Sequence, residues 1–436
     1  VLKDCTFQVC WLPAPGHDDA PDADDPPHVM WAGVAWRRDA DETFAALLDV
    51  SPQWLVVDHY AIDARWHDVL RDALGCRLLI VDDIADRLLS ADILLDQNWA
   101  EDHRAKYHGR LTREPKWLTG PRYALLSAAY RNAPRYRFHT EVRSIGIFMG
   151  GTDPCCASAS ALRCLREEVG FTGQVEVVST SANPHLSALR KACMASPRTM
   201  LTLDLPDLAA FFARHDLQIG AGGGSIWERC CIGPPTVSMI VAANQATSLP
   251  LLSRLGVLRT AVLGDLPTSL LVGHAEPLGA VVIRHIVNPE ERRVQAQAAS
   301  YLVDGRGAQR AALALTAPTL SVCRGSLEHL EQLHKWRNEP EIRRVSFPQV
   351  PPDSDLHLGW LKSVTESSNS ALFIGKVGGT SVGFAHFDEL ESSAAIVSIA
   401  IDPVFHKLGL GRYLLLTAEE ALCGWMKFPL HLVADI

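Results

Sequence analysis

Several features are scarce in this chain of 436 residues, and each scarcity argues against a class of protein. Charged residues make up 21% of the sequence and aromatic residues 7%, and the 41 Lys and Arg are outnumbered by 50 Asp and Glu, for a net charge of −9. This balance argues against nucleic-acid and anionic-membrane partners, because both bind dense positive charge. No apolar run approaches the roughly 20 residues that span a bilayer, and no signal-peptide pattern occurs, so we expect a cytoplasmic protein.

Cysteine patterns typical of metal or redox sites are also missing. The 11 cysteines include no CxxC pair, which is the usual signature of a zinc or thioredoxin-type site. The adjacent pairs Cys155/Cys156 and Cys230/Cys231 lie where helices are predicted to begin. Buried thiols in a reducing compartment explain them better than disulfides do. We therefore expect no metal.

The arrangement of apolar runs predicts an α/β protein. Over the first three quarters of the chain, short apolar runs alternate with longer amphipathic stretches, which is typical of parallel-sheet units. A polar, Arg-rich stretch at 130–143 separates two such blocks, and beyond 316–320 consecutive strand-like runs indicate antiparallel α+β structure. We predict two Rossmann-like lobes at 1–138 and 139–318 and an α+β domain at 319–436. Strands are expected at 6–12, 54–57, 78–81, 93–95, 144–149, 175–179, 217–221, 236–240, 371–377, 381–387 and 394–401.

The most informative stretch is QIGAGGGSIWERCCIGPP at 218–235. Three glycines, Gly222, Gly223 and Gly224, follow an apolar strand, and Ser225 opens a helix that carries Glu228 in its first turn. Glycine lets the backbone approach a bulky anion, and the free amides at a helix start favour negative charge. A carboxylate one turn into the helix can accept hydrogen bonds from ribose hydroxyls. The pattern predicts a nucleotide diphosphate site, and the alternative is a glycine turn that only packs a helix on a sheet.

A second glycine turn follows the first strand of the same lobe. It contains Gly150 and Gly151 in the run GGTDP. Ligands of open α/β sheets bind at the carboxyl ends of the strands, so we expect both glycine turns to line one crevice. Asn244 and Gln245, which follow the strand at 236–240, place two amide side chains at the same rim, with helix capping as the alternative.

These motifs together resemble a known family. The runs LVVDHYAID, LLIVDDIADR, LLDQN, SIGIFMGGTDP, IGAGGGSIWERCCIGPP, AANQ and VDGRGAQR occur in the order found in the UDP-sugar hydrolases of pseudaminic acid biosynthesis, which are related to the two-lobed GT-B glycosyltransferases. The resemblance extends from about residue 1 to residue 310. It implies a GT-B-like fold and hydrolysis of UDP-2,4-diacetamido-2,4,6-trideoxy-β-L-altropyranose, in which water attacks the anomeric carbon and UDP leaves.

The resemblance also implies roles for individual residues. Gly222, Gly223, Gly224 and Ser225 would hold the diphosphate, Glu228 the ribose, and Asn244 and Gln245 the sugar, with Gly150 and Gly151 in the same UDP-sugar site. Tyr60 would reach across the cleft with Asp58 behind it. The family's general base is a histidine in a GxGHxxR loop near the N-terminus, and this chain has no such loop. His28-Val29-Met30-Trp31 lacks the glycines of that loop and is not assigned its role, and neither is His59. Because residues 1–4 look like the end of a first helix, we expect the base to lie outside this chain, with the first lobe incomplete at its start.

The third domain has a motif of its own, IAIDPVFHKLGLGR at 399–412. A strand, a turn whose Gly409 and Gly411 expose amides, and a helix start again suit a pyrophosphate. The motif resembles the acetyl-CoA loop of GNAT acetyltransferases, Q/R-x-x-G-x-G/A, with His406 in the Q/R position. A glycine turn in an unrelated α+β domain is the alternative. The resemblance implies that acetyl-CoA is bound by Ile399, Ile401, His406, Lys407, Leu408, Gly409, Leu410, Gly411 and Arg412.

A second segment of the third domain resembles GNAT enzymes that act on nucleotide-linked amino sugars. This run, WRNEPEIRR at 336–344, implies that Trp336, Arg337 and Asn338 lie on the acceptor-sugar side. Since a GNAT fold continues past the strand expected at 429–433, we also expect this domain to be incomplete at its end.

These expectations combine into a bifunctional enzyme whose ligand is a small-molecule UDP-linked amino sugar. The third domain would acetylate the 4-amino group with acetyl-CoA, and the two lobes would hydrolyse the product. Two alternatives stay open: a GT-B glycosyltransferase, or a non-catalytic nucleotide-sugar module attached to an acetyltransferase. The sequence does not separate them, because all three would hold UDP in the same way.

Overall fold

The computed structural model describes residues 8–16, 25–241, 245–263, 276–316, 320–344, 353–377, 379–391, 394–405, 410–423 and 431–433. Contacts divide the chain into two compact units, Val1–Ala311 and Ala312–Ile436. The domain boundaries expected at 138/139 and 318/319 stay predictions. The fold class is confirmed, since the first unit is α/β with parallel sheets and the second is α+β.

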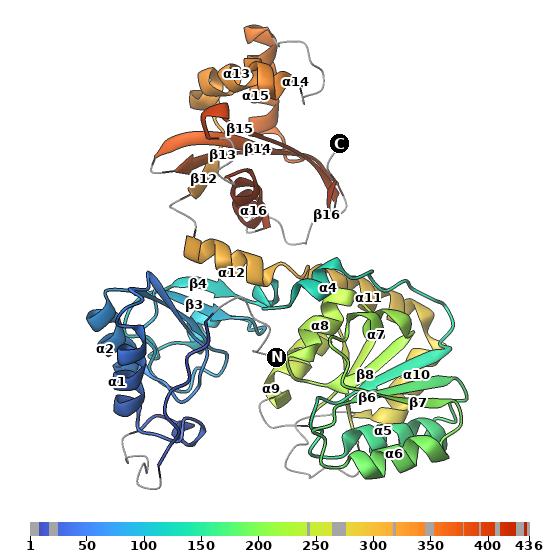
Figure 1. The fold of residues 1–436 in the computed structure, drawn as a ribbon. Coiled ribbons are helices and arrows are strands. Elements are labelled where there is room, and N and C mark those ends of the chain that lie inside the picture. Colours follow the sequence, from blue (N-terminus) through green and yellow to red (C-terminus); the bar gives the residue numbers. More distant parts are fainter. Residues whose placement is uncertain are drawn as a thin grey trace. The chain divides into compact units, whose positions relative to one another are not determined.

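The first unit begins with a four-stranded parallel sheet in the order β1-β2-β3-β4. Its strands β3 and β4 are labelled in Figure 1. Its amphipathic helices bury one stripe each against these short apolar strands. The local signals agree, since Asp63 caps α2 by accepting from the Arg65 amide, and Gly75 ends it in the left-handed region at φ 62°. The elements are α1 (Trp36–Leu47), β1 (Trp54–Val57), α2 (Ala64–Leu74), β2 (Arg77–Val81), β3 (Ile93–Asp96), α3 (His103–Lys106), β4 (Lys116–Thr119) and α4 (Ala128–Asn132).

A second parallel sheet in the same unit has the order β11-β10-β9-β8-β5-β6-β7. Helices α5, α6 and α10 pack on one face and α7, α8, α9 and α11 on the other, so its central strands are apolar on both sides (Figure 1). The elements are β5 (Ser144–Phe148), α5 (Ala157–Arg163), β6 (Gln174–Ser179), α6 (Leu186–Ala195), β7 (Thr199–Leu203), α7 (Ala209–Arg214), β8 (Leu217–Ala221), α8 (Ser225–Ile232), β9 (Thr236–Met239), α9 (Gln245–Arg254), β10 (Arg259–Val262), β11 (Glu276–Pro277), α10 (Leu278–Val287), α11 (Pro289–Leu302) and α12 (Gly307–Thr316).

The second unit contains a five-stranded sheet in the order β12-β13-β14-β15-β16. The first four strands are antiparallel neighbours, whereas β16 pairs with β15 in parallel. Helices α13 and α15 pack on one face and α16 on the other (Figure 1). The elements are β12 (Leu320–Arg324), α13 (Leu330–Asn338), α14 (Pro340–Arg344), α15 (Ser354–Glu366), β13 (Ala371–Val377), β14 (Thr380–Glu391), β15 (Ala394–Ile401), α16 (Leu410–Cys423) and β16 (His431–Val433).

One expected strand is wrong where the structure describes it. Residues 8–12 of the predicted strand 6–12 have no regular structure, and residues 6 and 7 lie outside the described part of the chain. A strand is stable only when a neighbour completes its hydrogen bonds, and no described segment pairs with residues 8–12. Conversely, the sequence pattern does not predict β7 and β10, because their half-buried residues do not form a distinct apolar run.

Candidate functional site

The two glycine turns meet at the point where the strand order of the second sheet reverses. From β5 the chain runs outward through β6 and β7, and it then returns to place β8 on the other side of β5. Adjacent parallel strands whose connections depart in opposite directions leave a crevice at their carboxyl ends. The turn after β5 carries Gly150 and Gly151, and the turn after β8 carries Gly222 to Gly224. The topology therefore places both turns at one crevice.

A pocket of about 590 Å³ occupies this crevice and contains most of the residues predicted to bind the UDP-sugar. Seven predicted residues line it: Gly150, Gly151, Gly223, Gly224, Ser225, Glu228 and Gln245. Gly222 lies just behind the lining, where a Cβ atom would be 2.6 Å from Leu249 Cδ1. Asn244, the remaining predicted sugar contact of this lobe, lies outside the described residues.

Only some of the glycines at this pocket are required by the fold. Gly150 has φ 96°, a conformation that L-residues with side chains rarely adopt, and Gly222 has no room for a Cβ atom. At Gly223 and Gly224 no such constraint exists, because neither has a left-handed φ and a Cβ atom on either would meet nothing within 4 Å. Open space above exposed backbone is the geometry that lets a diphosphate approach helix α8.

Glu228 faces the pocket from the first turn of α8. Burial raises the pKa of its carboxyl group, against the opposing effects of a hydrogen bond from Tyr130 and the charge of Arg229. The Tyr130 hydroxyl also accepts a hydrogen bond from the Leu208 amide at 3.2 Å. A half-buried carboxylate with a fixed donor beside it suits hydroxyl groups of a ligand. Sequence reasoning missed Tyr130, which lies in the polar stretch between the two sheets.

Arg229 is a second residue that sequence reasoning missed. Its fully buried guanidinium lies under the glycine turn, where Nη2 donates to the Ala221 carbonyl at 2.7 Å and Nη1 to Ser225 Oγ at 3.2 Å. Desolvation lowers its pKa to about 10, so it stays charged at neutral pH. Its hydrogen bonds hold the two ends of the turn, Ala221 and Ser225, and its positive charge lies below the expected position of the diphosphate.

Tyr60 belongs to a hydrogen-bonded path that leads from the first sheet to helix α8. Its hydroxyl donates to Asp83 Oδ1, and Asp83 Oδ2 accepts from Asn98 Nδ2 at 2.7 Å. The side-chain Oδ1 of Asn98 in turn accepts from Trp227 Nε1 at 3.0 Å. Burial, with the hydrogen bond to Asp83, raises the pKa of Tyr60, so the phenol acts as a donor. Asp58, also after β1, has a pKa raised by burial and by the charge of Asp83.

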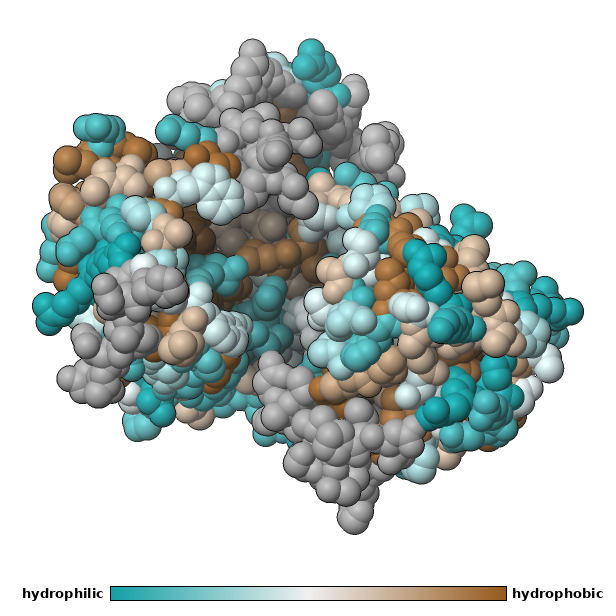
Figure 2. Space-filling view, turned by 60° about the horizontal axis from the view of Figure 1, so that its bottom comes forward, coloured by the Kyte–Doolittle hydropathy of each residue, from teal (hydrophilic) through white to brown (hydrophobic). Residues whose placement is uncertain are grey.

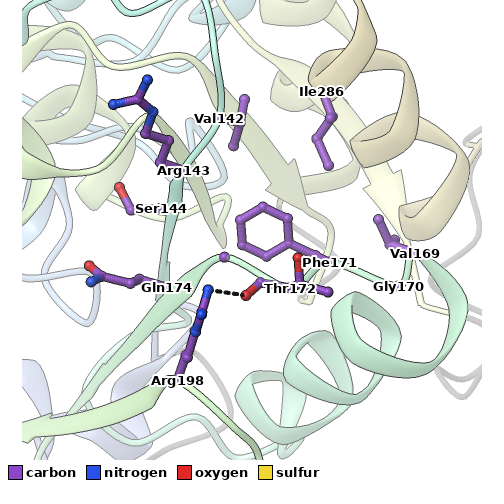
Figure 3. Close-up of a pocket in the computed structure, with 11 residues that line it drawn as sticks. Val142, Arg143, Ser144, Val169, Gly170, Phe171, Thr172, Gln174, Arg198 and Ile286 are labelled. Carbon is purple, nitrogen blue, oxygen red and sulfur yellow. Dashed lines mark hydrogen bonds between the residues drawn. The ribbon is translucent and has the colours of Figure 1, made fainter.

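Another cavity lies at the opposite end of the second sheet. It measures about 750 Å³ and lies near Ser144 and Gln174, which begin β5 and β6 (Figure 3). Arg198 points across its floor and donates to the Thr172 carbonyl at 3.4 Å. Because ligands of parallel sheets bind at the carboxyl ends of the strands, this larger cavity is a weaker candidate than the crevice at the glycine turns.

In the second unit, strand β15 and helix α16 flank the predicted acetyl-CoA loop. Ile399 is exposed on β15 and Ile401 packs toward α16, whereas Leu410 is buried, so that only its backbone could contact a ligand. Gly411 and exposed Arg412 lie in the first turn of α16. The predicted residues His406, Lys407, Leu408 and Gly409 lie outside the described part of the chain.

Trp336, predicted on the acceptor-sugar side, lies in the core of the second unit. Its indole is fully buried, stacks on Phe384, and donates from Nε1 to Asp402 Oδ2 at 2.8 Å. The periodicity of α13 turns this position toward the sheet, and its place on the acceptor-sugar side stays a prediction. Its neighbours Arg337 and Asn338 are partly exposed, and Asn338 donates to the His334 carbonyl at 3.0 Å.

The described residues were also compared with the requirements of a metal site and of a membrane-spanning helix. They contain no group of three or more side chains arranged to hold a metal ion. Their helices include none with the length and apolarity needed to cross a bilayer. On the face drawn in Figure 2, hydrophobic residues occur in small groups among hydrophilic ones.

Comparison with known proteins supports the assignment of the second unit. Residues 330–427 match the model of the Acetyltransferase (GNAT) family. This match covers the helices and strands from α13 to α16 that surround the predicted acetyl-CoA loop. The chain therefore contains a GNAT acetyltransferase domain.

The chain also resembles a protein of sugar biosynthesis. It is 27% identical over 154 residues to the spore coat polysaccharide biosynthesis protein SpsG of Bacillus subtilis, which is 34% of this chain and 44% of that protein. The chain thus matches less than half the length of this relative.

Solved structures with some likeness include Acinetobacter baumannii MurG and a Vibrio cholerae spermidine N-acetyltransferase with bound CoA and spermine. MurG is 12% identical with a TM-score of 0.42, over 64% of this chain and 78% of that one. The acetyltransferase is 16% identical with a TM-score of 0.24, over 25% of this chain and 66% of that one. At these values neither structure carries an inference about function.

Proposed function

We propose that this chain is a bifunctional nucleotide-sugar enzyme of pseudaminic acid biosynthesis. The second unit transfers an acetyl group from acetyl-CoA to the 4-amino group of a UDP-linked amino sugar. The first unit hydrolyses the acetylated product, UDP-2,4-diacetamido-2,4,6-trideoxy-β-L-altropyranose, to the free sugar and UDP. The product of one reaction is then the substrate of the other.

The observation that carries the hydrolase half is the pocket at the strand reversal of the second sheet. It combines two glycine turns, the start of α8 and the half-buried Glu228, which together suit a diphosphate next to a ribose. Similarity to a sugar-biosynthesis protein supports the same substrate class. The acetyltransferase half is supported by the GNAT match and by the strand β15 and helix α16 that flank the predicted loop.

The chemistry needed from the first unit is modest, because UDP is a good leaving group. As the glycosidic C–O bond breaks, negative charge grows on the β-phosphate oxygens. The amides of the Gly222–Ser225 turn, backed by the positive charge of Arg229, stabilise that charge in a site already shaped for it. Tyr60, held by Asp83, remains a hydrogen-bond donor on the opposite sheet.

The experiment is a coupled assay of the full chain. The UDP-linked 4-amino sugar is supplied with and without acetyl-CoA, and free thiol and UDP are quantified separately. We expect thiol release with the amino sugar, and UDP release only after acetylation. Transfer of the sugar to an added acceptor would identify a glycosyltransferase instead. Tight UDP binding with no UDP release from the acetylated substrate would identify a binding module.

A further inference from the structure

Tyr130 reaches the nucleotide pocket from outside the second sheet. It belongs to helix α4, in the stretch of chain between the two sheets, yet it lines the pocket together with Glu228, Asp207 and Leu208. Its side chain is buried, with the residue only 4% exposed. A buried phenol needs partners for its hydroxyl group, and this hydroxyl finds them in two other segments that line the same pocket.

The contacts of the Tyr130 hydroxyl fix the direction of its hydrogen. The Leu208 amide donates to the hydroxyl oxygen at 3.2 Å, so the oxygen acts as an acceptor toward this amide. A phenol has one hydrogen to donate, and its acceptor is the carboxyl group of Glu228. The nearby Asp207 has a different task, since its Oδ1 accepts from the Ala209 amide at 2.9 Å at the start of α7. Tyr130 therefore donates to Glu228.

The rest of Tyr130 is held as firmly as its hydroxyl. The Cys231 thiol donates to the Tyr130 carbonyl oxygen at 3.8 Å, which joins α4 to helix α8. The ring belongs to the same hydrophobic cluster as Leu208, Phe212 and Trp227. A donor that is fixed by its ring, its backbone and its own acceptor contact can set the orientation of the group it bonds to.

The orientation of Glu228 matters because of what its carboxylate has left to offer. An ionised carboxylate has about four lone-pair sites, so the bond from Tyr130 leaves most of them for a ligand. Glu228 lies in the first turn of α8, next to the amides expected to hold the diphosphate, and the ribose of a nucleotide is attached directly to its diphosphate. Ribose hydroxyls can donate to this carboxylate only when it faces the pocket.

We propose that Tyr130 is a positioning residue of the nucleotide site: by donating to Glu228 it holds the carboxylate toward the ribose hydroxyls, and so makes the site selective for a ribonucleoside diphosphate over its 2′-deoxy counterpart. Tyr130 acts through Glu228 and needs no contact of its own with the nucleotide. This assignment rests on the proposed function, since it takes the pocket to hold UDP, and it adds the residue that sets the choice of sugar.

The charges around Glu228 provide a second observable, which is the pH at which affinity for the nucleotide is lost. Burial raises the pKa of its carboxyl group, the Tyr130 hydrogen bond and the charge of Arg229 lower it, and the charge of Asp207 raises it. Within the described residues, these are the ionisable groups that act on it from α4, α8 and the segment before α7, and the thiol of Cys231 stays neutral because burial raises its pKa. Loss of the Tyr130 hydroxyl should therefore raise the pKa of Glu228 further.

The test compares the Kd values of UDP and 2′-deoxy-UDP for the full chain by titration calorimetry. We expect wild type to bind 2′-deoxy-UDP at least about tenfold more weakly than UDP, as for a lost hydrogen bond to a charged group. In Tyr130→Phe this ratio should fall to within about threefold, and the acid loss of UDP affinity should begin about one pH unit higher. The titration of UDP itself is the same for every variant, so it cancels from the comparison.

Tyr136→Phe is the matched control. This tyrosine lies in the same stretch between the two sheets and donates to the Asp216 carbonyl at 3.4 Å, but it is not among the residues that line the pocket. Its variant should keep the wild-type Kd ratio and pH dependence. Glu228→Asp withdraws the carboxylate from Tyr130 by one methylene and should also lose selectivity for ribose, so it decides the question if Tyr130→Phe does not fold, as judged by thermal melting.

The outcomes separate this assignment from the proposed function. A merely structural role of Tyr130 would weaken both nucleotides equally, so an unchanged Kd ratio and pH dependence in folded Tyr130→Phe would overturn the positioning role alone. Equal binding of the two nucleotides by wild type, or wild-type selectivity in Glu228→Asp, would do the same. Wild-type protein that binds neither nucleotide would overturn the proposed hydrolase function, and the role of Tyr130 with it.

Discussion

Gly223→Ala is expected to separate ligand binding from stability, because the folded turn has room for a methyl group at this position. A Cβ atom at this position would meet nothing within 4 Å, and the φ of Gly223 lies outside the left-handed region. The folded protein therefore accommodates alanine without strain. Alanine also reduces the freedom of the unfolded chain, so we expect the variant to be more stable by about 0.4–1 kcal/mol.

The same methyl group should weaken the binding of UDP. It would point into the open space above the turn, which is where the diphosphate must approach the amides at the start of α8. Loss of close approach should raise the Kd for UDP at least about tenfold, which corresponds to about 1.4 kcal/mol. Stability and affinity are thus expected to change in opposite directions.

Urea unfolding and titration calorimetry with UDP measure the two quantities. Gly359→Ala, in helix α15 of the other unit and also with open space at Cβ, is the matched control that should change stability without affecting UDP. Gly222→Ala should behave differently. Its Cβ atom would lie 2.6 Å from buried Leu249 Cδ1, so we expect the free energy of unfolding to fall by about 1–3 kcal/mol. If Gly223→Ala binds UDP as tightly as wild type, the diphosphate does not lie over this turn.

Three further changes test other parts of the structure. Because burial raises the pKa of Glu228, its carboxylate form is lost at a higher pH than for an ordinary glutamate, so UDP affinity should weaken as pH falls through that raised value. Glu228→Gln should abolish this pH dependence in calorimetry. The carboxylate of Asp153 accepts hydrogen bonds from the amides of Ala157 and Ser158 in α5 at 2.8 and 2.9 Å. Asp153→Ala should therefore lower the free energy of unfolding by about 1–2 kcal/mol, as measured by urea unfolding. Trp336→Phe removes the indole N–H that donates to Asp402 and should destabilise the acetyltransferase unit by about 1–3 kcal/mol, as measured by thermal melting. An unchanged melting temperature would contradict the core position of Trp336.

Much of the fold was predictable because parallel strands buried on both faces are continuous apolar runs. Strands β5 and β8 are mostly apolar and come close to this pattern, although β8 includes the buried Gln218, and the glycines after them are visible in the sequence as sharp turns. Strands β7 and β10 were not predictable in this way, because their residues are mostly half-buried and lack a clear apolar pattern. The burial of Trp336 was not predictable either, since a motif likeness does not reveal which face of a helix is buried.

The sequence by itself determined the fold class, the two glycine turns and Glu228, because each depends on residues close together in the chain. Only the tertiary structure decided which distant residues meet. Hydrogen bonding places β8 beside β5 and so brings the two turns into one pocket, which also includes Tyr130. It likewise brings His28 to Asp86, 58 positions away. Such contacts depend on the order of strands in a sheet, which local pattern and propensity do not encode.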